Sequence, residues 1–367
     1  MNLKENVKKL LGMLEGFQPK QFSVVVMPDF FLDRFVSIDT DVADFSKILA
    51  SIASRKGGAV DEVKQLEFRG GNAANTASAL AKLGAKVYAI INTGRLGLVM
   101  LKHYLQPLGV DLSRVKANGE TSITTALELK YDKERINVML RDLGSLKNFG
   151  PENLEEEDFE LLARADYVCL FNWAGTRKYG TELAKTVFSH VKIHGKGKTY
   201  FDTADPSPNK KAIKRLVNEV LLANLIDILS LNENEAIWYG SAICKGKEKG
   251  KEDRSLEEKA KENAKQLARC INGRVDLHTT KFSSTFLREE AEFSVPTFKV
   301  NVLRVTGAGD AWNAGNIFAD AQGFSHELRL TFANAVAAYY ISNPNAEHPT
   351  LEDLRKFLKR QVKREKL

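Results

Sequence analysis

Short apolar runs alternate with longer helical stretches along most of this chain, and this alternation limits the fold more than any other feature. The runs are rich in Val, Ile, Leu and aromatic side chains, which is typical of buried strands. Strand candidates are residues 22–27, 87–91, 167–171, 199–202, 226–231 and 275–279. Strands that alternate with helices form a mostly parallel sheet covered by helices. The 367 residues are enough for one large domain of this kind, so an α/β fold is predicted.

Several segments between these strands have patterns of their own. Two β-rich runs, 122–131 and 135–141, flank a short turn and predict a β-hairpin. Residues 43–54 have the apolar spacing of a helix, and an apolar run at 293–303 predicts a strand that leads into a helix. Residues 245–262 are dense in Lys, Glu and Gly, and they predict a charged surface insertion.

The net charge of +7 is concentrated at the C-terminus. From Arg355 to Leu367 there are seven basic residues and one acid, so the rest of the chain is close to neutral. A basic groove for nucleic acid is therefore not expected. No apolar run approaches the length of a membrane span, and the three cysteines show no metal-binding or disulfide spacing. These features predict a cytoplasmic protein without a nucleic-acid or membrane partner.

A Thr-Gly-Ala-Gly-Asp motif at 306–310 lies where the predicted strand gives way to a helix. Glycine lets backbone amides approach a ligand closely, and a helix N-terminus favours anions. Asp310 in the first turn would stand beside a bound anion. A phosphoryl-transfer enzyme needs a carboxylate at such a place to take the proton of the acceptor hydroxyl. The same residues also fit a helix N-cap after a glycine turn, and this stretch alone does not separate the two interpretations.

A second glycine motif, Gly-Gly-Asn-Ala-Ala-Asn at 70–75, opens a helix of small residues that ends at Gly84. The first turn of this helix offers Asn72 and Asn75, whose amides can donate to and accept from hydroxyl groups. A tightly packed alanine-rich helix without a ligand is the alternative.

Asn232 and Glu235 follow a predicted strand and lie one helical turn apart. An amide and a carboxylate at that edge can organise the water shell of a magnesium ion, although Asn-x-x-Glu is also an ordinary helix start. His278, on a predicted strand, is expected to be a satisfied core residue. The sequence at 197–199 imitates the end of a P-loop, but Lys192 replaces the required glycine and a strand follows.

Together, these three motifs resemble the ribokinase-like (PfkB) family of sugar and nucleoside kinases. The resemblance runs from about residue 22 to residue 358, and the two glycine motifs are specific in combination. It implies a three-layer αβα fold with a central, mostly parallel sheet and a small β-sheet lid. The lid is expected to include residues 30–40 and 121–142. The whole chain, 1–367, is then expected to be one kinase domain with the surface insertion at 245–262.

The resemblance also implies roles for individual residues. Asp310 matches the catalytic base, and the anion hole would consist of Gly307, Ala308 and Gly309. The positions that match substrate contacts are Asp33, Gly70, Gly71, Asn72 and Asn75. The positions that match contacts to the nucleotide or its magnesium ion are Asn232, Glu235, Thr279, Thr306 and Asn334, with Glu235 holding the metal through water.

Three features depart from the family pattern. Arg304 and Val305 stand where relatives have Asp-Thr or Asp-Pro, and that acid helps to hold a monovalent cation in potassium-activated members. An arginine should repel such a cation, so potassium is not expected to be needed. Residues 279–284 lack the glycines of the family's nucleotide loop, which leaves both ATP and ADP open as donors. Gly70 lies 37 positions after Asp33, so an unusual lid and substrate are expected.

The leading hypothesis is a magnesium-dependent kinase that moves the terminal phosphoryl group of a nucleotide, ATP in the first place, to a hydroxyl group of a sugar or nucleoside. An ADP-dependent sugar kinase is the alternative within the family. A catalytically weak, sugar-binding or regulatory relative is the alternative from a different functional class. Assembly as a homodimer is left open.

Overall fold

The computed structural model describes residues 3–132, 134–243, 254–288 and 291–364. Its centre is an eight-stranded sheet with the strand order β12-β11-β10-β9-β8-β7-β1-β4. The strands from β4 to β10 pair in parallel, whereas β11 and β12 are antiparallel additions at one edge. The strands are β1 (Ser23–Met27), β4 (Lys86–Ala89), β7 (Tyr167–Leu170), β8 (Lys198–Asp202), β9 (Ile228–Leu231), β10 (Arg274–His278), β11 (Phe282–Phe286) and β12 (Glu292–Pro296).

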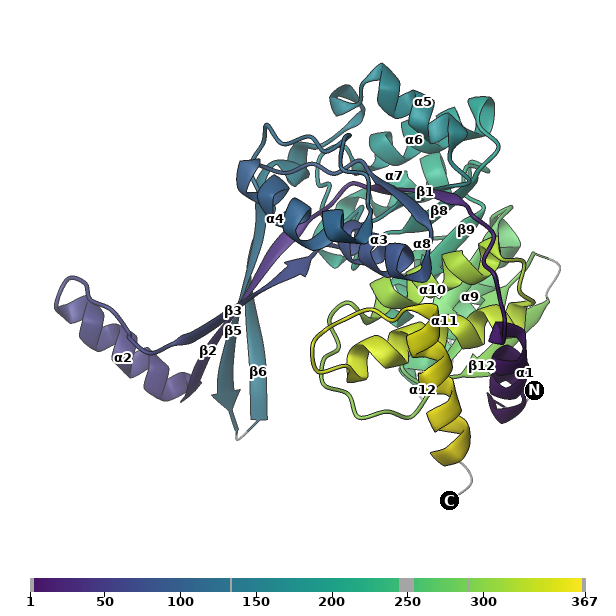
Figure 1. Ribbon diagram of the computed structural model, residues 1–367. Helices are drawn as coiled ribbons and strands as arrows, with labels where there is room; N and C mark the ends of the chain where they lie inside the picture. The colour runs from purple at the N-terminus through teal and green to yellow at the C-terminus, as the bar shows by residue number, and fades with distance from the viewer. Residues whose placement is uncertain (1–2, 133, 244–253, 289–290, 365–367) are drawn as a thin grey trace.

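Helices cover both faces of this sheet, because alternate residues of a strand point to opposite sides. In β1, Val24 and Val26 join one hydrophobic cluster, whereas Val25 and Met27 join the other. The first cluster includes residues of α1 (Leu3–Leu14), α3 (Asn72–Leu83), α4 (Arg95–Leu105), α10 (Ala308–Ala321), α11 (His326–Ser342) and α12 (Leu351–Arg364). The second includes residues of α5 (Glu156–Arg164), α6 (Gly180–His194), α7 (Ile213–Leu216), α8 (Glu233–Ile243) and α9 (Leu256–Cys270). The predicted three-layer α/β architecture is confirmed (Figure 1).

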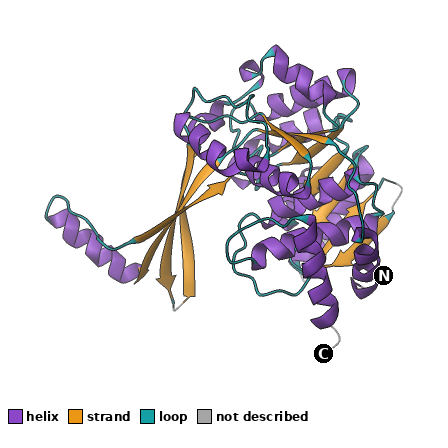
Figure 2. Ribbon diagram, in the orientation of Figure 1, coloured by secondary structure: helices purple, strands orange, loops and turns teal. Residues whose placement is uncertain are grey.

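A smaller four-stranded sheet with the order β3-β2-β5-β6 projects from this body (Figure 2). Its strands are β2 (Phe31–Asp41), β3 (Lys64–Gly70), β5 (Ser122–Tyr131) and β6 (Glu134–Asp142). We call these four strands the lid sheet. The segments expected to form the lid, 30–40 and 121–142, lie in it, and the predicted hairpin is its antiparallel β5–β6 pair.

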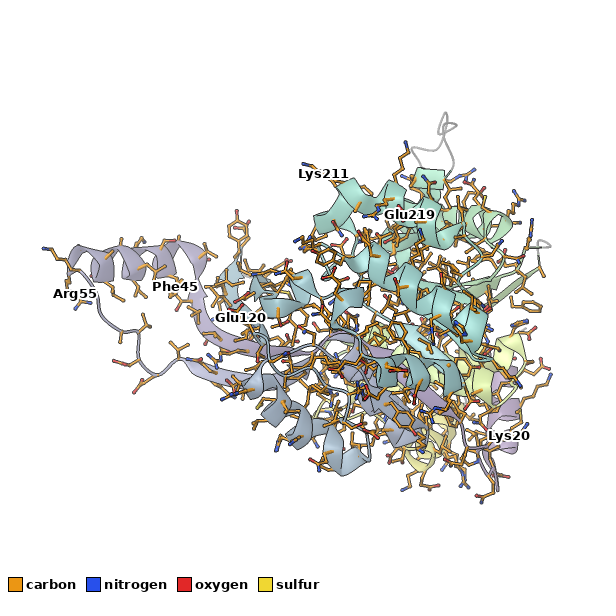
Figure 3. All side chains as sticks on the ribbon, turned by 90° about the horizontal axis from the view of Figure 1, so that it is seen from above. Lys20, Phe45, Arg55, Glu120, Lys211 and Glu219 are labelled. Atoms are coloured by element: carbon orange, nitrogen blue, oxygen red, sulfur yellow. The ribbon has the colours of Figure 1, made fainter. Side chains whose placement is uncertain are left out.

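The extra length between Asp33 and Gly70 forms β3 and one helix, α2 (Val42–Ser54). The side chain of Asp41 accepts a hydrogen bond from the Ala43 N–H and caps the start of this helix. No residue of α2 is buried. Figure 3 shows the helix extending away from the body between Phe45 and Arg55. The predicted helix at 43–54 is therefore present, and it connects β2 and β3 of the lid sheet.

Two predictions about surface segments need correction. The run at 293–303 does not form one strand, because β12 ends at Pro296, which has no N–H for the sheet ladder. Of the expected insertion at 245–262, residues 256–262 are instead the start of α9, where the Ser255 hydroxyl accepts from the Glu258 N–H. Residues 244–253 lie outside the described ranges. Shorter helical turns are η1 (Gln106–Leu108), η2 (Gly144–Asn148), η3 (Pro151–Asn153), η4 (Ser207–Ala212) and η5 (Val217–Leu221).

Candidate active site

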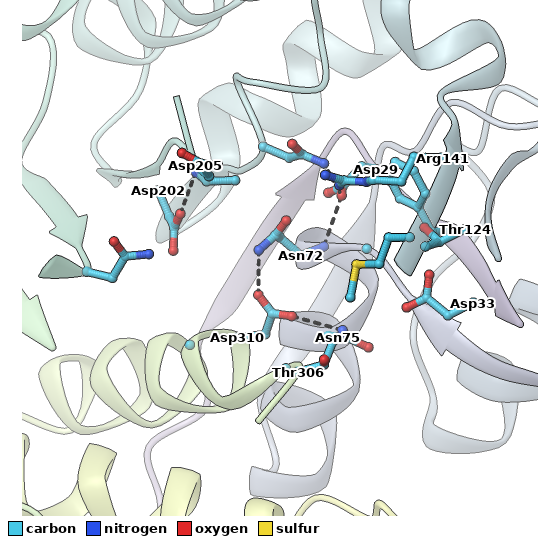
Figure 4. Close-up of a pocket in the computed structure, with 18 of the residues that line it drawn as sticks. Asp29, Asp33, Asn72, Asn75, Thr124, Arg141, Asp202, Asp205, Thr306 and Asp310 are labelled. Carbon is cyan, nitrogen blue, oxygen red and sulfur yellow. Dashed lines mark hydrogen bonds between the residues drawn. The ribbon is translucent and has the colours of Figure 1, made fainter. Parts of the chain in front are cut away.

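A cavity of about 320 Å³ lies between the lid sheet and the body (Figure 4). It opens at the carboxyl edge of the central sheet, where ligands bind in open α/β folds. The lining residues from the lid sheet include three polar side chains, Asp33, Thr124 and Arg141, beside apolar ones. Lining residues from the body include Asp29, Gly71, Asn72, Asn75, Asp202, Asn232, Glu235, His278, Thr306, Gly307, Gly309 and Asp310. Residues from all three sequence motifs thus meet in one place.

Asp310 lies in the first turn of α10 and is only 6% exposed. The Asn72 amide donates to its Oδ1 at 2.8 Å, and the Asn75 amide donates to its Oδ2 at 2.9 Å. Burial raises the pKa of Asp310 to about 8, and the nearby charge of Asp202 adds to this shift. The two hydrogen bonds act in the opposite direction, since they favour the charged form. The two glycine motifs therefore meet at one oriented carboxyl group.

Backbone amides at the start of α10 are the donors that an anion would meet. Gly307 has a φ of 84°, and a side chain there would come within 2.8 Å of the Tyr340 hydroxyl. The Ala308 N–H donates to the Val305 carbonyl at 3.2 Å, so it is already engaged. Within the described residues, the N–H groups of Gly307 and Gly309 have no such acceptor. Of the three residues expected to form an anion hole, two offer a free donor.

Asp29, at the end of β1, holds the other glycine motif in place. Its carboxylate accepts from the backbone N–H groups of Asn72 and Ala73, both at 2.9 Å, and from the Asn172 amide at 2.8 Å. These contacts satisfy free donors at the N-terminus of α3. Gly71 packs so closely against the backbone of Phe30 that a Cβ at position 71 would lie 2.8 Å from the Phe30 Cα. Asp29 therefore fixes the turn that presents Asn72 to Asp310.

Asp33 projects from the lid sheet into the same cavity. A Cβ at Gly70 would come within 2.1 Å of an Asp33 carboxylate oxygen, so glycine at this position makes room for the acid. Burial raises the pKa of Asp33 to about 6, against the opposing effects of the Thr124 hydroxyl and the Arg141 charge. Asp33 is thus a half-buried carboxyl group beside hydroxyl and guanidinium groups, which suits binding of a polyhydroxylated ligand.

Asn232 and Glu235 form a reciprocal cap at the start of α8. The backbone N–H of Asn232 donates to Glu235 at 2.9 Å, and its side-chain amide donates to the other carboxylate oxygen at 2.8 Å. The Glu235 N–H returns a bond to Asn232 at 3.0 Å. Both residues also line the cavity. The motif is therefore an ordinary helix start and part of the candidate site at once.

Acidic groups in the body wall of the cavity form no ion pair with a Lys or Arg among the described residues. Burial raises the pKa of Asp29, Asp202 and Glu235, and the charge of Asp202 raises that of Glu235 further. A magnesium ion would relieve this repulsion. In the described ranges, no group of three or more His, Cys, Asp or Glu side chains forms a metal cage. The residues fit a magnesium ion that keeps most of its ligands as water and phosphate oxygens.

Two residues predicted to contact the nucleotide do not line the cavity. The Thr279 hydroxyl closes the tight β10–β11 turn, accepting from the Phe282 N–H at 2.9 Å and donating to the Phe282 carbonyl at 2.7 Å. Asn334 is 3% exposed, and its carbonyl oxygen accepts from Ser283 and Trp312. Both side chains satisfy the protein's own polar groups in this structure, and their contact with the nucleotide stays a prediction.

The lining residues that were not predicted as site residues include Asp29, Arg141, Asp202 and His278. Asp29 lies just past the end of β1 and Asp202 is the last residue of β8, and that position at the carboxyl edge was the available signal. His278 was expected to be satisfied in the core, but its Nε2 has no hydrogen-bond partner among the described residues. Burial lowers its pKa to about 4, so the ring is neutral beside Gly309. Nothing in the hairpin pattern of 122–141 marked Arg141.

Arg304, which stands where the family pattern has an acid, forms hydrogen bonds near the end of α11. Its guanidinium donates to the backbone carbonyls of Tyr340, Asn343 and Pro344 near the end of α11, and it lies 5.8 Å from the Tyr340 ring centroid. Carbonyl oxygens at a helix C-terminus attract cations. A cation that belongs to the chain itself thus occupies this group of oxygens.

The fold is the one seen in ribokinase-like proteins of known structure. Ribokinase from Arabidopsis thaliana, solved with ribose and ATP, has a TM-score of 0.67 and 22% identity over 94% of this chain and 99% of that chain. A nucleoside kinase from Methanocaldococcus jannaschii has a TM-score of 0.65 and 18% identity over 94% of this chain and 100% of that chain. At these identities the likeness defines the fold class.

Sequence comparison identifies the family within that class. Residues 33–353 match the pfkB family of carbohydrate kinases. The chain is 24% identical over 356 residues to 5-dehydro-2-deoxygluconokinase of Clostridium beijerinckii, which covers 89% of this chain and 91% of the relative. It is 24% identical over 296 residues to ribokinase of Haemophilus influenzae, which covers 79% and 87%. The chain belongs to the pfkB family and is a carbohydrate kinase.

Proposed function

We propose that this carbohydrate kinase transfers the terminal phosphoryl group of ATP to an alcohol group of a sugar, with Asp310 as the base. The observation that carries the proposal is the start of α10. A buried carboxyl group is oriented there by two amide side chains, next to backbone N–H groups that lack acceptors. Phosphoryl transfer depends mainly on such positioning and charge stabilisation.

In the proposed reaction, the acceptor hydroxyl gives its proton to Asp310 while its oxygen bonds to the γ-phosphorus and the bond to the nucleotide breaks. Each Asp310 oxygen accepts one amide hydrogen bond and keeps a lone pair for the hydroxyl. The pKa of about 8 lies near a neutral working pH, which suits a general base. Bases of this kind contribute roughly 10²–10⁴-fold in rate.

The amides of Gly307 and Gly309 would stabilise negative charge on the transferred group. A preorganised donor of this type contributes about 3–4 kcal/mol. Thr306 lines the cavity beside them and could contact the same phosphate. Neutral His278 lies next to Gly309, where a Cβ would be 3.3 Å from its ring. This wall is therefore the proposed phosphate end of the cavity.

Magnesium would be held near Asn232, Glu235 and Asp202, largely through water. When bound, the ion would supply positive charge that neutralises the phosphate groups. The part played by the chain is to hold the carboxylates still, and the reciprocal Asn232–Glu235 bonds do this. This arrangement supports the expected water-mediated role of Glu235.

The acceptor and the donor are proposals at different levels of detail. Relatives named 5-dehydro-2-deoxygluconokinase and ribokinase favour a sugar over a nucleoside as acceptor. The glycine-free turn at Thr279 leaves ADP as an alternative to ATP. The same turn favours a second candidate function, a catalytically weak relative that binds sugars. Cytoplasmic location and assembly as a monomer or homodimer remain predictions, and no helix of the described ranges is long and apolar enough to cross a membrane.

A donor and acceptor matrix tests the proposal. Purified protein is incubated with Mg·ATP or Mg·ADP and a panel of sugars, sugar acids and nucleosides, and phosphorylated product is followed by ³¹P NMR. Product from ATP and a sugar supports the proposal, whereas AMP release from ADP would select the ADP-dependent alternative. Sugar binding by calorimetry without turnover for any pair would favour the regulatory candidate.

A further inference from the structure

Arg141 of β6 is placed beside the proposed acceptor site by the pairing of the lid sheet. Arg141 pairs with Thr124 of β5, and Thr124 pairs with Asp33 of β2. Paired residues of neighbouring strands face the same side of a sheet. All three side chains line the cavity, and Figure 4 shows Arg141 near Thr124, apart from Asp202 and Asp205.

The charge of Arg141 is exceptional in its surroundings. Among the described residues that line the cavity it is the one Lys or Arg, and it shares the space with six carboxyl groups: Asp29, Asp33, Asp202, Asp205, Glu235 and Asp310. Away from the backbone amides of the proposed phosphate end, these acids repel an anionic ligand, and Arg141 is the side chain that would attract one. The lid end and the body end of the cavity therefore differ in the charge that they accept.

The guanidinium of Arg141 is also free to bind. It stacks over the Phe31 ring with its carbon 5.7 Å from the centroid, and it makes no ion pair or hydrogen bond within the described residues. Arg34, on the same sheet, instead binds Glu67, with Nε donating at 3.0 Å. A second guanidinium, that of Arg177, lies nearby. Burial lowers the pKa of Arg177, and the charge of Arg141 lowers it further. Asp33 also lies near Arg141, but the two form no ion pair among the described residues, so the guanidinium is available to an anionic partner.

We propose that the acceptor is a sugar acid, whose carboxylate binds Arg141 while a hydroxyl group meets Asp33. This inference deepens the proposed function and rests on it, since it takes the cavity beside Asp33 to be the acceptor site. A guanidinium presents parallel N–H donors that match the two oxygens of a carboxylate. Aromatic stacking on Phe31 holds the fork in position before the ligand arrives.

Matched probes test this inference. D-Gluconate and D-galactonate are compared with D-glucitol and D-galactitol, which have the same carbon skeleton but a neutral CH₂OH group in place of the carboxylate. Binding is measured by calorimetry on the full chain, and phosphorylation by the release of ADP from Mg·ATP. We expect at least one acid to bind more tightly than its neutral counterpart.

The variants separate recognition of the carboxylate from structural effects. Arg141→Gln should weaken binding of the acid about 10- to 100-fold, as expected for a charged hydrogen-bonded pair, and leave the neutral counterpart unchanged. Arg141→Lys should recover part of the affinity, because it keeps the charge without the fork. Arg34→Gln is the control, since it removes a lid-sheet guanidinium that does not line the cavity.

Other outcomes would overturn the inference. These are equal loss of affinity for acid and neutral probe, a raised KM for the nucleotide alone, or no acid bound more tightly than its neutral counterpart. Failure of the proposed function would look different. In that case the acid would bind in an Arg141-dependent way, but no acceptor would be phosphorylated.

Discussion

The acids at the two ends of α10 have opposite properties. Asp310, in the first turn, is held by two neutral amides, and burial raises its pKa to about 8. Asp320, in the last turn, accepts from Arg274 at 2.6 Å, Lys198 at 2.7 Å and Tyr167. Burial alone would raise the pKa of Asp320 too, but the Arg274 charge and the hydrogen bonds from Lys198, Tyr167 and Arg274 together outweigh burial and lower it.

The helix dipole alone predicts the reverse order. It favours a negative charge at the start of a helix and disfavours one at the end, by about 0.3–1 kcal/mol. Direct pairing with a buried guanidinium is the larger effect, since breaking such a pair costs roughly 3–5 kcal/mol. The surroundings of each acid, rather than its position on the helix, therefore decide whether it is a structural carboxylate or one available for chemistry.

The largest expected effect is at Asp310. Asp310→Asn keeps the size of the side chain but cannot accept a proton, so kcat should fall by about 10²–10⁴-fold. Sugar affinity, measured by calorimetry, should change little. Thermal stability at pH 8 should not fall, because the variant removes a buried charge without a cationic partner. Retention of wild-type kcat would exclude Asp310 as the base.

At the other end of the helix, stability should respond instead of activity. Arg274→Met leaves Asp276 and Asp320 without a shared guanidinium partner, and the free energy of unfolding should fall by about 3–5 kcal/mol. Lys198→Met is the control, because Lys198 is half exposed and should contribute at most about 1 kcal/mol. Urea denaturation measures both, and kcat per folded molecule should be unchanged. Equal effects of the two variants would contradict the structural role of Arg274.

Asp310 and Asp276, the acid of β10 that also pairs with Arg274, should act in different pH windows. The pKa of Asp310 is raised on folding, so its contribution to stability is present below about pH 4 and is lost as the pH rises toward about 8. Burial alone would raise the pKa of Asp276, but the charges of Arg274 and Arg329 lower it to about 2. The contribution of Asp276 to stability is therefore present above about pH 4 and is lost as the pH falls toward 2. Relative to wild type, Asp310→Asn should therefore gain stability between about pH 4 and 8. A stability difference that is flat over that range would show that the pKa of Asp310 is not raised.

The same reasoning gives a pH profile for turnover. The deprotonated base is the active form, so kcat/KM for the acceptor should rise with pH up to about 8 and then level off. Initial rates between pH 5.5 and 9 at saturating Mg·ATP provide the measurement. A profile that is flat across this range would indicate that Asp310 is already ionised when the substrates bind.

Much of this comparison could be predicted from the sequence, but only at one end of α10. The glycines around Asp310 have local backbone reasons, so the motif could be recognised without the fold. Asp276 and Asp320 are 44 residues apart, and their shared partner is visible only after β10 and α10 pack together. The same limit explains Arg141, whose position depends on strand register, and Thr279, whose hydroxyl is taken up by the turn itself.

The smallest expected effect is that of potassium, which Arg304 is predicted to make unnecessary. The guanidinium of Arg304 donates to three backbone carbonyls at the end of α11, so a potassium ion there would meet both a filled site and a positive charge. Replacing sodium with potassium at constant ionic strength should change kcat by less than about twofold, since no bound potassium ion is then needed for the reaction. Arg304→Ala is the matched variant, because it removes the guanidinium from the three backbone carbonyls and changes no residue that lines the cavity. A large rise in the wild-type rate with potassium would show that the loop before Gly307 still needs a mobile cation.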